Sequence, residues 1–416
     1  MGNARVPTNR KDMVKNKILI LDSNRATLTV IRSLSKNGYE AIVGYIKDII
    51  GERFVTFSRY TRETWPHPGF NEEERFIEAL LCLLKERSDI NYIFPVGDTS
   101  SGLLARNYNR IIPYCEMVMA KPAAIETCLD KTITYKYVLE QNIPLPELSV
   151  VRNLVDIDAQ IKRIGYPFIL KPKNNLLPFF GKKCIICDTP NEYNKYFPKW
   201  PHKHQELIFQ RKVSGFRHDC MFTAIKGEIV CYFEKKIIRT DVYDSTGYEV
   251  EIVTVKPSER RKKYIELLTL ALDYSGIGCV QFLVNEKDDS SYFLEFNPRL
   301  DFGNALPYTC GLDFPKQAID VHRYLSGEID SLPCYKKDYQ VGKRIQWLLA
   351  DISGMLIALK RREISVSQGG IWFVRILFAL SRSPVHMTWS WKDPLPTLVM
   401  YKQEFSNIVL KRIGFG

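Results

Sequence analysis

The side chains best placed to do chemistry lie late in the chain, in two short apolar stretches that carry oxygen donors. Gln281 lies in the first stretch, Glu295 and Asn297 lie in the second, and Arg299 follows two residues later. Mg²⁺ takes oxygen ligands in near-octahedral geometry and usually shares its coordination shell with substrate phosphates. These residue types therefore indicate a magnesium site with a phosphate-binding cation beside it.

The spacing of these residues predicts how a sheet would hold them. Side chains alternate between the two faces of a strand, so Glu295, Asn297 and Arg299 should point the same way. Gln281 comes 14 residues before Glu295, which suits the neighbouring strand of an antiparallel pair with the polar stretch 285–291 as its turn. The alternative is an edge strand with a solvated polar face. The apolar flanks and the spacing of Gln281 favour the metal site.

The first part of the chain alternates short apolar strands with helical stretches. This pattern predicts a small parallel α/β layer. After the first strand the sequence runs from Asp22 to Ala26 with no Gly-x-Gly-x-x-Gly turn, so we do not expect it to bind a dinucleotide. The elements predicted are strands at 17–22, 41–45 and 92–96 and helices at 24–37 and 72–85.

Two lysines precede the late strands at the ends of predicted elements. Lys131 lies at the start of a predicted helix that runs to residue 141, and Lys171 lies near the end of a predicted strand over 165–171. Either lysine taken alone is more often a solvated surface residue.

Taken in order, these pieces resemble an ATP-grasp ligase. The resemblance covers about 18–327, and it is closest to the carbamoyl-phosphate-synthase-like branch, whose paired signature is matched by 279–282 and 295–299. It implies an α/β and α+β fold with an N-terminal Rossmann-like pre-ATP-grasp domain and a basic C-terminal extension. The expected divisions are a flexible leader at 1–16, the pre-ATP-grasp domain at 17–118, an ATP-grasp domain at 119–330 (small lobe about 119–208, large lobe about 209–330) and the extension at 331–416.

The resemblance also assigns roles to individual residues. Arg299 and Lys171 would act in catalysis, Arg299 by contacting the transferring phosphate, and Lys131 and Lys171 match the two phosphate-binding lysines of the family. The metal ligands would be Gln281, Glu295 and Asn297. The hinge residues Gln210, Arg211, Lys212 and Val213 would pair with adenine through the main chain, with a plain strand end as the alternative, and Asp301, Gly303 and Asn304 would meet the substrate.

The sequence departs from the family in two places. The loop at 173–183 has a single glycine, so it cannot offer the usual nest of amides to the phosphates. Lys182 and Lys183 would compensate by charge, while an apolar tip formed by Leu176, Leu177, Phe179 and Phe180 would touch the substrate or a membrane. The acidic residue that usually contacts the ribose is absent. Asp219 lies just beyond that position, and His218 beside it is a less favoured candidate for a general base.

The expected function is an ATP- and Mg²⁺-dependent ligase that activates a carboxylate as an acyl phosphate and joins it to an amine. Mn²⁺ is an allowed substitute for Mg²⁺, the substrates would be small molecules, such as a cell-surface glycan or secondary-metabolite precursor, and the family is often dimeric. Two alternatives stay open: a non-catalytic nucleotide-binding or scaffold protein of the same fold, and a carboxylate or carbamate kinase that does not ligate.

Composition limits the class of protein and its partners. A hydrophobic content of 45% and a charged content of 25% are those of an ordinary globular chain. The net charge is +12, and residues 331–416 carry 13 Lys and Arg against 5 Asp and Glu, which gives +8. No nucleic-acid motif accompanies that charge, so nucleic acid is not an expected partner.

The C-terminal extension contains an apolar, aromatic stretch at 371–382 with two arginines. The default prediction for this stretch is a buried helix. The alternative is a helix lying on an anionic membrane surface, since Trp372, Trp389 and Trp391 accompany the positive charge. Ten scattered cysteines suit reduced thiols, so the expected location is cytoplasmic, with peripheral contact at the inner face of the membrane if the alternative holds.

Overall fold

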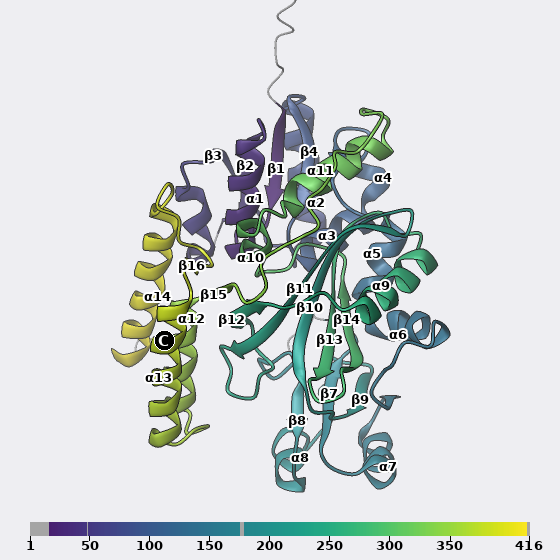
Figure 1. The fold of residues 1–416 in the computed structure, drawn as a ribbon, viewed down its shortest axis with the longest axis vertical. Coiled ribbons are helices and arrows are strands. Elements are labelled where there is room, and N and C mark those ends of the chain that lie inside the picture. Colours follow the sequence, from purple (N-terminus) through teal and green to yellow (C-terminus); the bar gives the residue numbers. More distant parts are fainter. Residues whose placement is uncertain (1–15, 48, 175–178, 414–416) are drawn as a thin grey trace, which may run out of the picture.

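The computed structural model describes residues 16–47, 49–174 and 179–413, and within these ranges the strands form three sheets (Figure 1). The predicted leader therefore lies almost wholly outside the described residues. In Figure 1 the parallel N-terminal sheet lies at the top, a small antiparallel lobe at the bottom, and the C-terminal helices along the left edge. The mixed α/β and α+β class predicted from the sequence is confirmed.

The N-terminal domain is a five-stranded parallel sheet in the order β3-β2-β1-β4-β5. Because β1 and β4 are neighbours and β2 lies on the far side of β1, the strand order reverses between them. Loops at such a reversal leave a crevice at the carboxyl ends of the strands, where open sheets commonly bind ligands. The strands are β1 (Lys17–Leu21), β2 (Glu40–Ile46), β3 (Thr61–His67), β4 (Ile90–Pro95) and β5 (Glu116–Met117), and the helices between and after them are α1 (Arg25–Lys36), the 3₁₀ helix η1 (Ile50–Phe57), α2 (Glu73–Glu86), α3 (Asp98–Arg106), α4 (Tyr108–Ile111) and α5 (Pro122–Leu129).

Local sequence signals set most of these boundaries. The Asn24 side chain caps α1 by accepting hydrogen bonds from the amides of Ala26 and Thr27. The helix ends at Asn37, and Gly38 follows with a φ of +88°, which glycine adopts without strain. The sequence did not predict β3, because this edge strand alternates charged and half-buried side chains and contains a proline.

The small lobe is a four-stranded antiparallel sheet in the order β6-β9-β7-β8. Its core centres on Phe168 and Phe209, whose rings stack with centroids 4.4 Å apart. The boundary predicted at 208 and 209 falls inside β9. The elements of this region are α6 (Lys131–Glu140), β6 (Leu148–Val151), α7 (Leu154–Ile164), β7 (Phe168–Pro172), β8 (Ile185–Cys187), α8 (Pro190–Tyr196) and β9 (Leu207–Arg211).

The large lobe is a seven-stranded sheet in the order β14-β13-β10-β11-β12-β15-β16. Helix α9 covers one face of this sheet, and α10 and α11 follow strand β14 in the chain. The elements are β10 (Phe216–Ile225), β11 (Glu228–Thr240), β12 (Glu249–Thr254), α9 (Glu259–Ala271), β13 (Gly276–Asn285), β14 (Ser290–Asn297), α10 (Ala305–Thr309), α11 (Phe314–Leu325), β15 (Arg344–Gln346) and β16 (Val385–His386).

The C-terminal extension is built into the rest of the fold. Its strand β15 pairs with β12 of the large lobe, and its helices are α12 (Leu348–Lys360), α13 (Val366–Arg382) and α14 (Leu395–Ile413). The buried Asp393 accepts hydrogen bonds from Arg32 at 2.9 Å and from Ser58 at 2.7 Å, both in the N-terminal domain. The extension therefore contacts both the large lobe and the N-terminal domain.

The prediction that residues 371–382 form a buried helix is wrong. Only one stripe of α13 is covered, formed by Gly369, Trp372, Ile376 and Ala379. The rest of the helix is exposed although it is apolar: Val374 is 64% exposed, Phe378 55% and Leu377 50%. The helix therefore leaves a large apolar face uncovered within the described part of the chain.

Candidate active site

The hairpin of β13 and β14 holds the predicted metal ligands in the predicted register. Gln281 lies directly opposite Glu295, and Cys279 lies opposite Asn297. Opposite residues of an antiparallel pair present their side chains on the same face. The predicted antiparallel pair is thus confirmed, and its turn lies between Asn285 and Ser290.

A cavity of about 560 Å³ lies where the hairpin, the small lobe and the N-terminal domain meet. It gathers charged and amide side chains from segments more than 100 residues apart. The predicted site residues that line it are Lys131, Lys182, Lys183, Gln281, Glu295, Asn297, Arg299 and Asp301.

Glu295 is ionised in this cavity because cations surround it. Burial alone would raise the pKa of its carboxyl group, but the ammonium groups of Lys131 and Lys183 and a hydrogen bond from Asn297 outweigh that effect and lower the pKa to about 2. The Lys131 ammonium lies 3.9 Å from the carboxylate, and the Asn297 amide nitrogen lies 3.3 Å from it. Glu295 is therefore available as an anionic metal ligand at neutral pH.

Lys171 does not line the cavity itself, although it lies close to the residues that do. Its ammonium group is 5.3 Å from the centre of the Tyr135 ring. Burial lowers the pKa of Lys171 to about 8, while the charge of Glu295 opposes that shift. Lys183 lines the cavity with its ammonium 4.0 Å from the centre of the Tyr248 ring, and burial lowers its pKa as well.

The donor set fits a hard divalent cation. Gln281, Glu295 and Asn297 supply oxygens, and the neighbouring lysines and Arg299 would repel a bare ion until phosphates balance their charge. In the structure the Asn297 side-chain oxygen accepts a hydrogen bond from Arg299 at 3.2 Å. A metal ion bound to that oxygen would replace this hydrogen bond.

The predicted hinge residues lie outside the cavity lining. Gln210 is buried on β9, and its amide nitrogen has no hydrogen-bond partner among the described residues. Arg211 pairs with Glu147 at 2.8 Å and Lys212 pairs with Asp188 at 2.6 Å. Val213, the next residue, is half-buried. The pairing of these four residues with adenine stays a prediction.

Asp219 lies on β10, directly opposite Gln281 of the neighbouring strand β13. It is completely buried and does not line the cavity. Burial raises the pKa of its carboxyl group against the charges of Arg217 and Lys235. Asp219, Cys279 and Asp301 come within 4.8 Å of one another, a spacing that could suit a metal. Because the Lys235 ammonium bonds directly to Asp301, that space already holds a cation.

The other two predicted substrate residues, Gly303 and Asn304, follow Asp301 closely in the chain. A side chain at Gly303 would meet the Lys235 ammonium at 2.4 Å, which explains the glycine. Asn304 is buried and donates to the Ala26 carbonyl at 3.4 Å. Of this predicted set, Asp301 therefore reaches the cavity, while Gly303 and Asn304 support the wall behind it.

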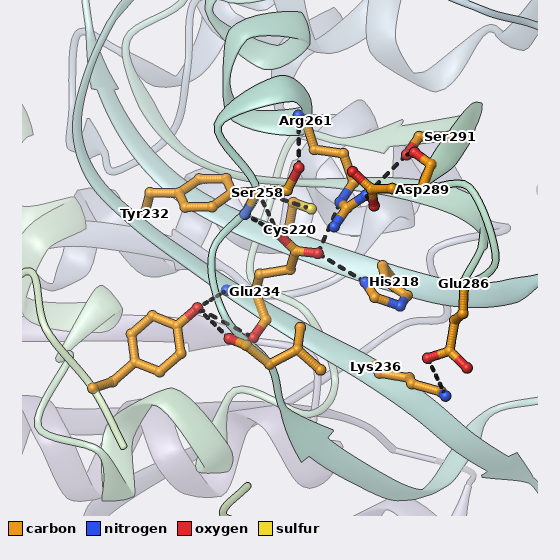
Figure 2. A network of polar contacts seen from close by, with 12 residues as sticks. His218, Cys220, Tyr232, Glu234, Lys236, Ser258, Arg261, Glu286, Asp289 and Ser291 are labelled. Carbon is orange, nitrogen blue, oxygen red and sulfur yellow. Dashed lines mark hydrogen bonds and ion pairs between the residues drawn. The ribbon is translucent and has the colours of Figure 1, made fainter. Parts of the chain in front are cut away.

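His218 lies on the opposite face of β10 from Asp219, inside a buried polar network (Figure 2). Its Nδ1 lies 2.7 Å from Glu234, which also accepts from Arg261 at 2.8 Å and from Tyr232 at 3.0 Å. This network joins β10 and β11 to α9. Its position argues against His218 as a general base at the cavity.

The structure describes residues 173, 174 and 179–183 of the loop at 173–183. Leu176 and Leu177 of the predicted apolar tip lie outside the described residues. Phe179 is buried against His204 and Phe197, whereas Phe180 is 45% exposed. Of the two predicted compensating lysines, Lys182 is ion-paired with Asp244 at 3.5 Å.

Sequence reasoning missed several residues that line the cavity. Asp22 and Asp98 come from the loops after β1 and β4, and Tyr248 and Glu249 come from the large lobe. A signal for the first two was present. Both lie at the carboxyl ends of predicted parallel strands, which meet at one edge of a sheet.

Comparison with known proteins agrees with this geometry. The family described as carbamoyl-phosphate synthase L chain, ATP binding domain, matches residues 257–323. Among curated relatives, a D-alanine–D-alanine ligase of Thermoanaerobacter sp. (strain X514) is 26% identical over 190 residues, which is 41% of this chain and 51% of the relative. A D-aspartate ligase of Enterococcus faecium (strain Aus0004) is 26% identical over 139 residues, 30% of this chain and 33% of the relative. The chain thus spans between a third and half of the length of these relatives.

Solved structures give the fold. N5-carboxyaminoimidazole synthetase from Staphylococcus aureus in complex with ADP superposes with a TM-score of 0.61 at 16% identity, covering 79% of this chain and 80% of that one. An L-amino acid ligase from Bacillus licheniformis superposes with a TM-score of 0.59 at 14% identity, covering 76% of each chain. The chain thus shares the fold of these solved structures, and its match to the carbamoyl-phosphate synthase ATP-binding domain spans β13 and β14.

Proposed function

We propose that the protein is an ATP- and Mg²⁺-dependent ligase that converts a carboxylate to an acyl phosphate and joins it to an amine. The observation that carries the proposal is the register of the hairpin, which sets Gln281 against Glu295 inside a cavity lined by cations. A carboxylate is a poor electrophile, and phosphorylation supplies its leaving group. That step needs two anions to approach each other, which fixed cations and a metal ion make feasible.

Each residue has a specific task in this proposal. Gln281, Glu295 and Asn297 hold the metal, which neutralises charge on the nucleotide phosphates. Lys131 and Lys171 bind phosphate oxygens, and Arg299 contacts the transferring phosphoryl group, for which a planar, permanently charged guanidinium is suited. Relatives with similar folds carry names of ligases, which supports amide-type bond formation.

The test is ADP release with a panel of carboxylates and amines. Glu295→Gln should lower metal-dependent turnover by about 100-fold or more, because it removes an anionic ligand from the reacting centre. Glu286→Gln is the matched control: Glu286 is exposed in the turn of the same hairpin, pairs with Lys236 and is absent from the cavity lining. Equal turnover in both variants would contradict the assignment.

The same assay separates the two alternatives. Nucleotide binding without turnover on any substrate pair would favour a scaffold protein. Turnover that needs only the carboxylate, with a phosphorylated product by mass, would favour a kinase. The glycine-poor loop at 173–183 is the observation that keeps the scaffold reading open.

We also propose that the C-terminal extension, residues 331–416, contacts an anionic membrane surface. The exposed apolar face of α13 supports this, since large uncovered apolar patches on a folded protein usually mark an interaction site. Among the described residues no helix combines the length and apolarity that spanning a bilayer would need, so the proposal is limited to surface contact. Exposed basic residues lie nearby: Arg375 and Arg382 on α13, Lys360 at the end of α12, and Arg361 and Arg362 in the turn between the two helices.

Flotation with vesicles of anionic and of neutral lipid tests the contact. Replacing Phe373, Leu377 and Phe378 with serine should abolish binding to anionic vesicles without unfolding the protein, because all three are exposed. The matched control replaces Leu139 and Val155, which are exposed apolar residues on α6 and α7. If the first variant instead dissociates a dimer in sedimentation and vesicle binding is absent in the wild type, the apolar face serves a homodimer.

A further inference from the structure

The N-terminal domain contacts the proposed phosphoryl-binding residue directly. Asp98 is the first residue of α3, and it receives two hydrogen bonds from the guanidinium of Arg299, which lies 201 residues away in the chain. The Nε–Oδ1 distance is 2.5 Å and the Nη2–Oδ2 distance is 2.8 Å. Two parallel bonds of this kind fix the plane and the direction of a guanidinium group.

The remaining donors of Arg299 are almost fully used. A guanidinium has five N–H groups. Nη2 also donates to the Asn297 oxygen at 3.2 Å, and Nη1 donates to the Leu300 carbonyl at 2.8 Å. The Phe302 ring lies 4.7 Å from the guanidinium carbon. Arg299 is therefore held on several sides, and only 8% of its side chain is exposed.

This arrangement decides which edge of Arg299 can face a phosphate. Asp98 occupies the fork formed by Nε and Nη2. One N–H of Nη1 stays unused by the hydrogen bonds described, and the Nη2–H bonded to Asn297 is released when that amide oxygen turns to a metal ion. With Asp98 in place, these two N–H groups are the ones available to a phosphoryl oxygen.

We propose that Asp98 is a positioning residue, which fixes Arg299 so that its outer edge meets the transferring phosphoryl group. The proposal rests on the proposed function and adds a role for the N-terminal domain in it. A misplacement of about 1 Å in such a group can cost about 100-fold in rate.

A purely structural reading is that Asp98 only docks the two domains. Other residues also hold the N-terminal domain against the large lobe, so a docking role of Asp98 can be separated from its positioning of Arg299. Tyr92 on β4 donates to Glu328, just beyond α11, at 2.8 Å, with neither residue in the cavity lining. Glu328→Gln therefore weakens docking without touching Arg299.

The experiment compares nucleotides that differ in the γ-phosphate. Affinities of ADP and of AMP-PNP, both with Mg²⁺, are measured by calorimetry for the wild type, Asp98→Asn, Arg299→Ala, the double variant and Glu328→Gln. We expect Asp98→Asn to weaken AMP-PNP about tenfold while ADP changes little, in line with the loss seen when a supporting partner of a site residue is removed. Arg299→Ala should likewise weaken AMP-PNP binding more than ADP binding. The double variant should bind AMP-PNP no more weakly than Arg299→Ala does.

The outcomes are distinguishable. If Asp98→Asn and Glu328→Gln behave alike toward both nucleotides, Asp98 has only a docking role and the inference is overturned. If Arg299→Ala leaves the ratio of the two affinities unchanged, Arg299 does not meet the γ-phosphate and the inference is overturned with it. If the wild type binds neither nucleotide, the proposed function itself fails, and no phosphoryl group remains for Arg299 to meet. Thermal unfolding of each variant checks that it is folded.

Discussion

Lys171 should make nucleotide affinity depend on pH in the range where most lysines do not titrate. Burial lowers its pKa to about 8, so about half of the free protein carries a neutral Lys171 at pH 8. A bound phosphate favours the charged form and restores the proton. Nucleotide binding should therefore take up a proton, and affinity should fall as the pH rises above 8.

The magnitude follows from the pKa. With a value of about 8, the charged fraction of Lys171 falls from about 0.9 at pH 7 to about 0.1 at pH 9, so affinity should fall about tenfold, or about 1.4 kcal/mol. Proton uptake on binding should rise from about 0.1 to about 0.9 over the same range. The stability of the free protein changes with pH in the opposite direction to its nucleotide affinity. The buried charge costs stability below pH 8, and that cost is relieved as the pH rises from 8 toward the unfolded value of 10.5.

The assay is titration calorimetry with Mg·ADP in two buffers of different ionisation enthalpy, at pH 7, 8 and 9. Lys171→Met should bind more weakly at pH 7 and lose the extra proton uptake. Lys173→Met is the control, because Lys173 is 43% exposed and pairs with Asp130 and Glu206. Proton uptake that is the same in wild type and Lys171→Met at every pH would refute the reasoning.

Other changes test the site and its supports. Glu295→Gln should remove the part of the unfolding free energy that the wild type loses as pH falls from 4.5 to 2, about 3 kcal/mol, as followed by acid unfolding. Asp393→Ala leaves the buried Arg32 without its carboxylate and should cost about 3 kcal/mol in urea unfolding. Gly303→Ala drives a methyl group into the buried Lys235 and should cost about 2 kcal/mol by thermal unfolding.

Each of these predictions has an outcome that contradicts it. If Glu295→Gln unfolds in acid along the same curve as wild type, the lysines around the carboxylate do not set its pKa. A loss below about 1 kcal/mol for Asp393→Ala would match an exposed ion pair, so the extension would not hold the N-terminal domain. An unchanged Tm for Gly303→Ala would mean that Lys235 moves freely in its enclosure.

The late hairpin could be predicted because its signals are local. Alternation fixed the face shared by Glu295, Asn297 and Arg299, and the 14-residue spacing to Gln281 suited a tight antiparallel turn. The same local logic placed the start of the first helix at residue 24, where Asn24 caps α1. Edge strand β3 was missed because its half-exposed, charged pattern carries little apolar periodicity.

The C-terminal extension shows the limit of reading apolar content as burial. The stretch that forms α13 is apolar on nearly every side, and such a helix is usually a core helix. Burial depends on what packs against the helix, and α12 covers one stripe of it through Trp372 and Ile376. The amount of covering surface is a property of the whole fold, so composition alone could not supply it.

The pairing of the cations in the cavity could not be predicted from the sequence, since it depends on which distant segments the fold brings together. Lys131, Lys182, Lys183, Arg217 and Arg299 line the cavity, and Asp22, Asp98, Glu249, Glu295 and Asp301 balance them. Buried charges are tolerated only when they are paired, so the acidic loops of the N-terminal sheet are needed by the cations of the other lobes. The domain that lacks a dinucleotide loop thus still contributes to the cavity at the carboxyl ends of its strands, where Asp22 and Asp98 lie among the cations proposed to bind phosphate.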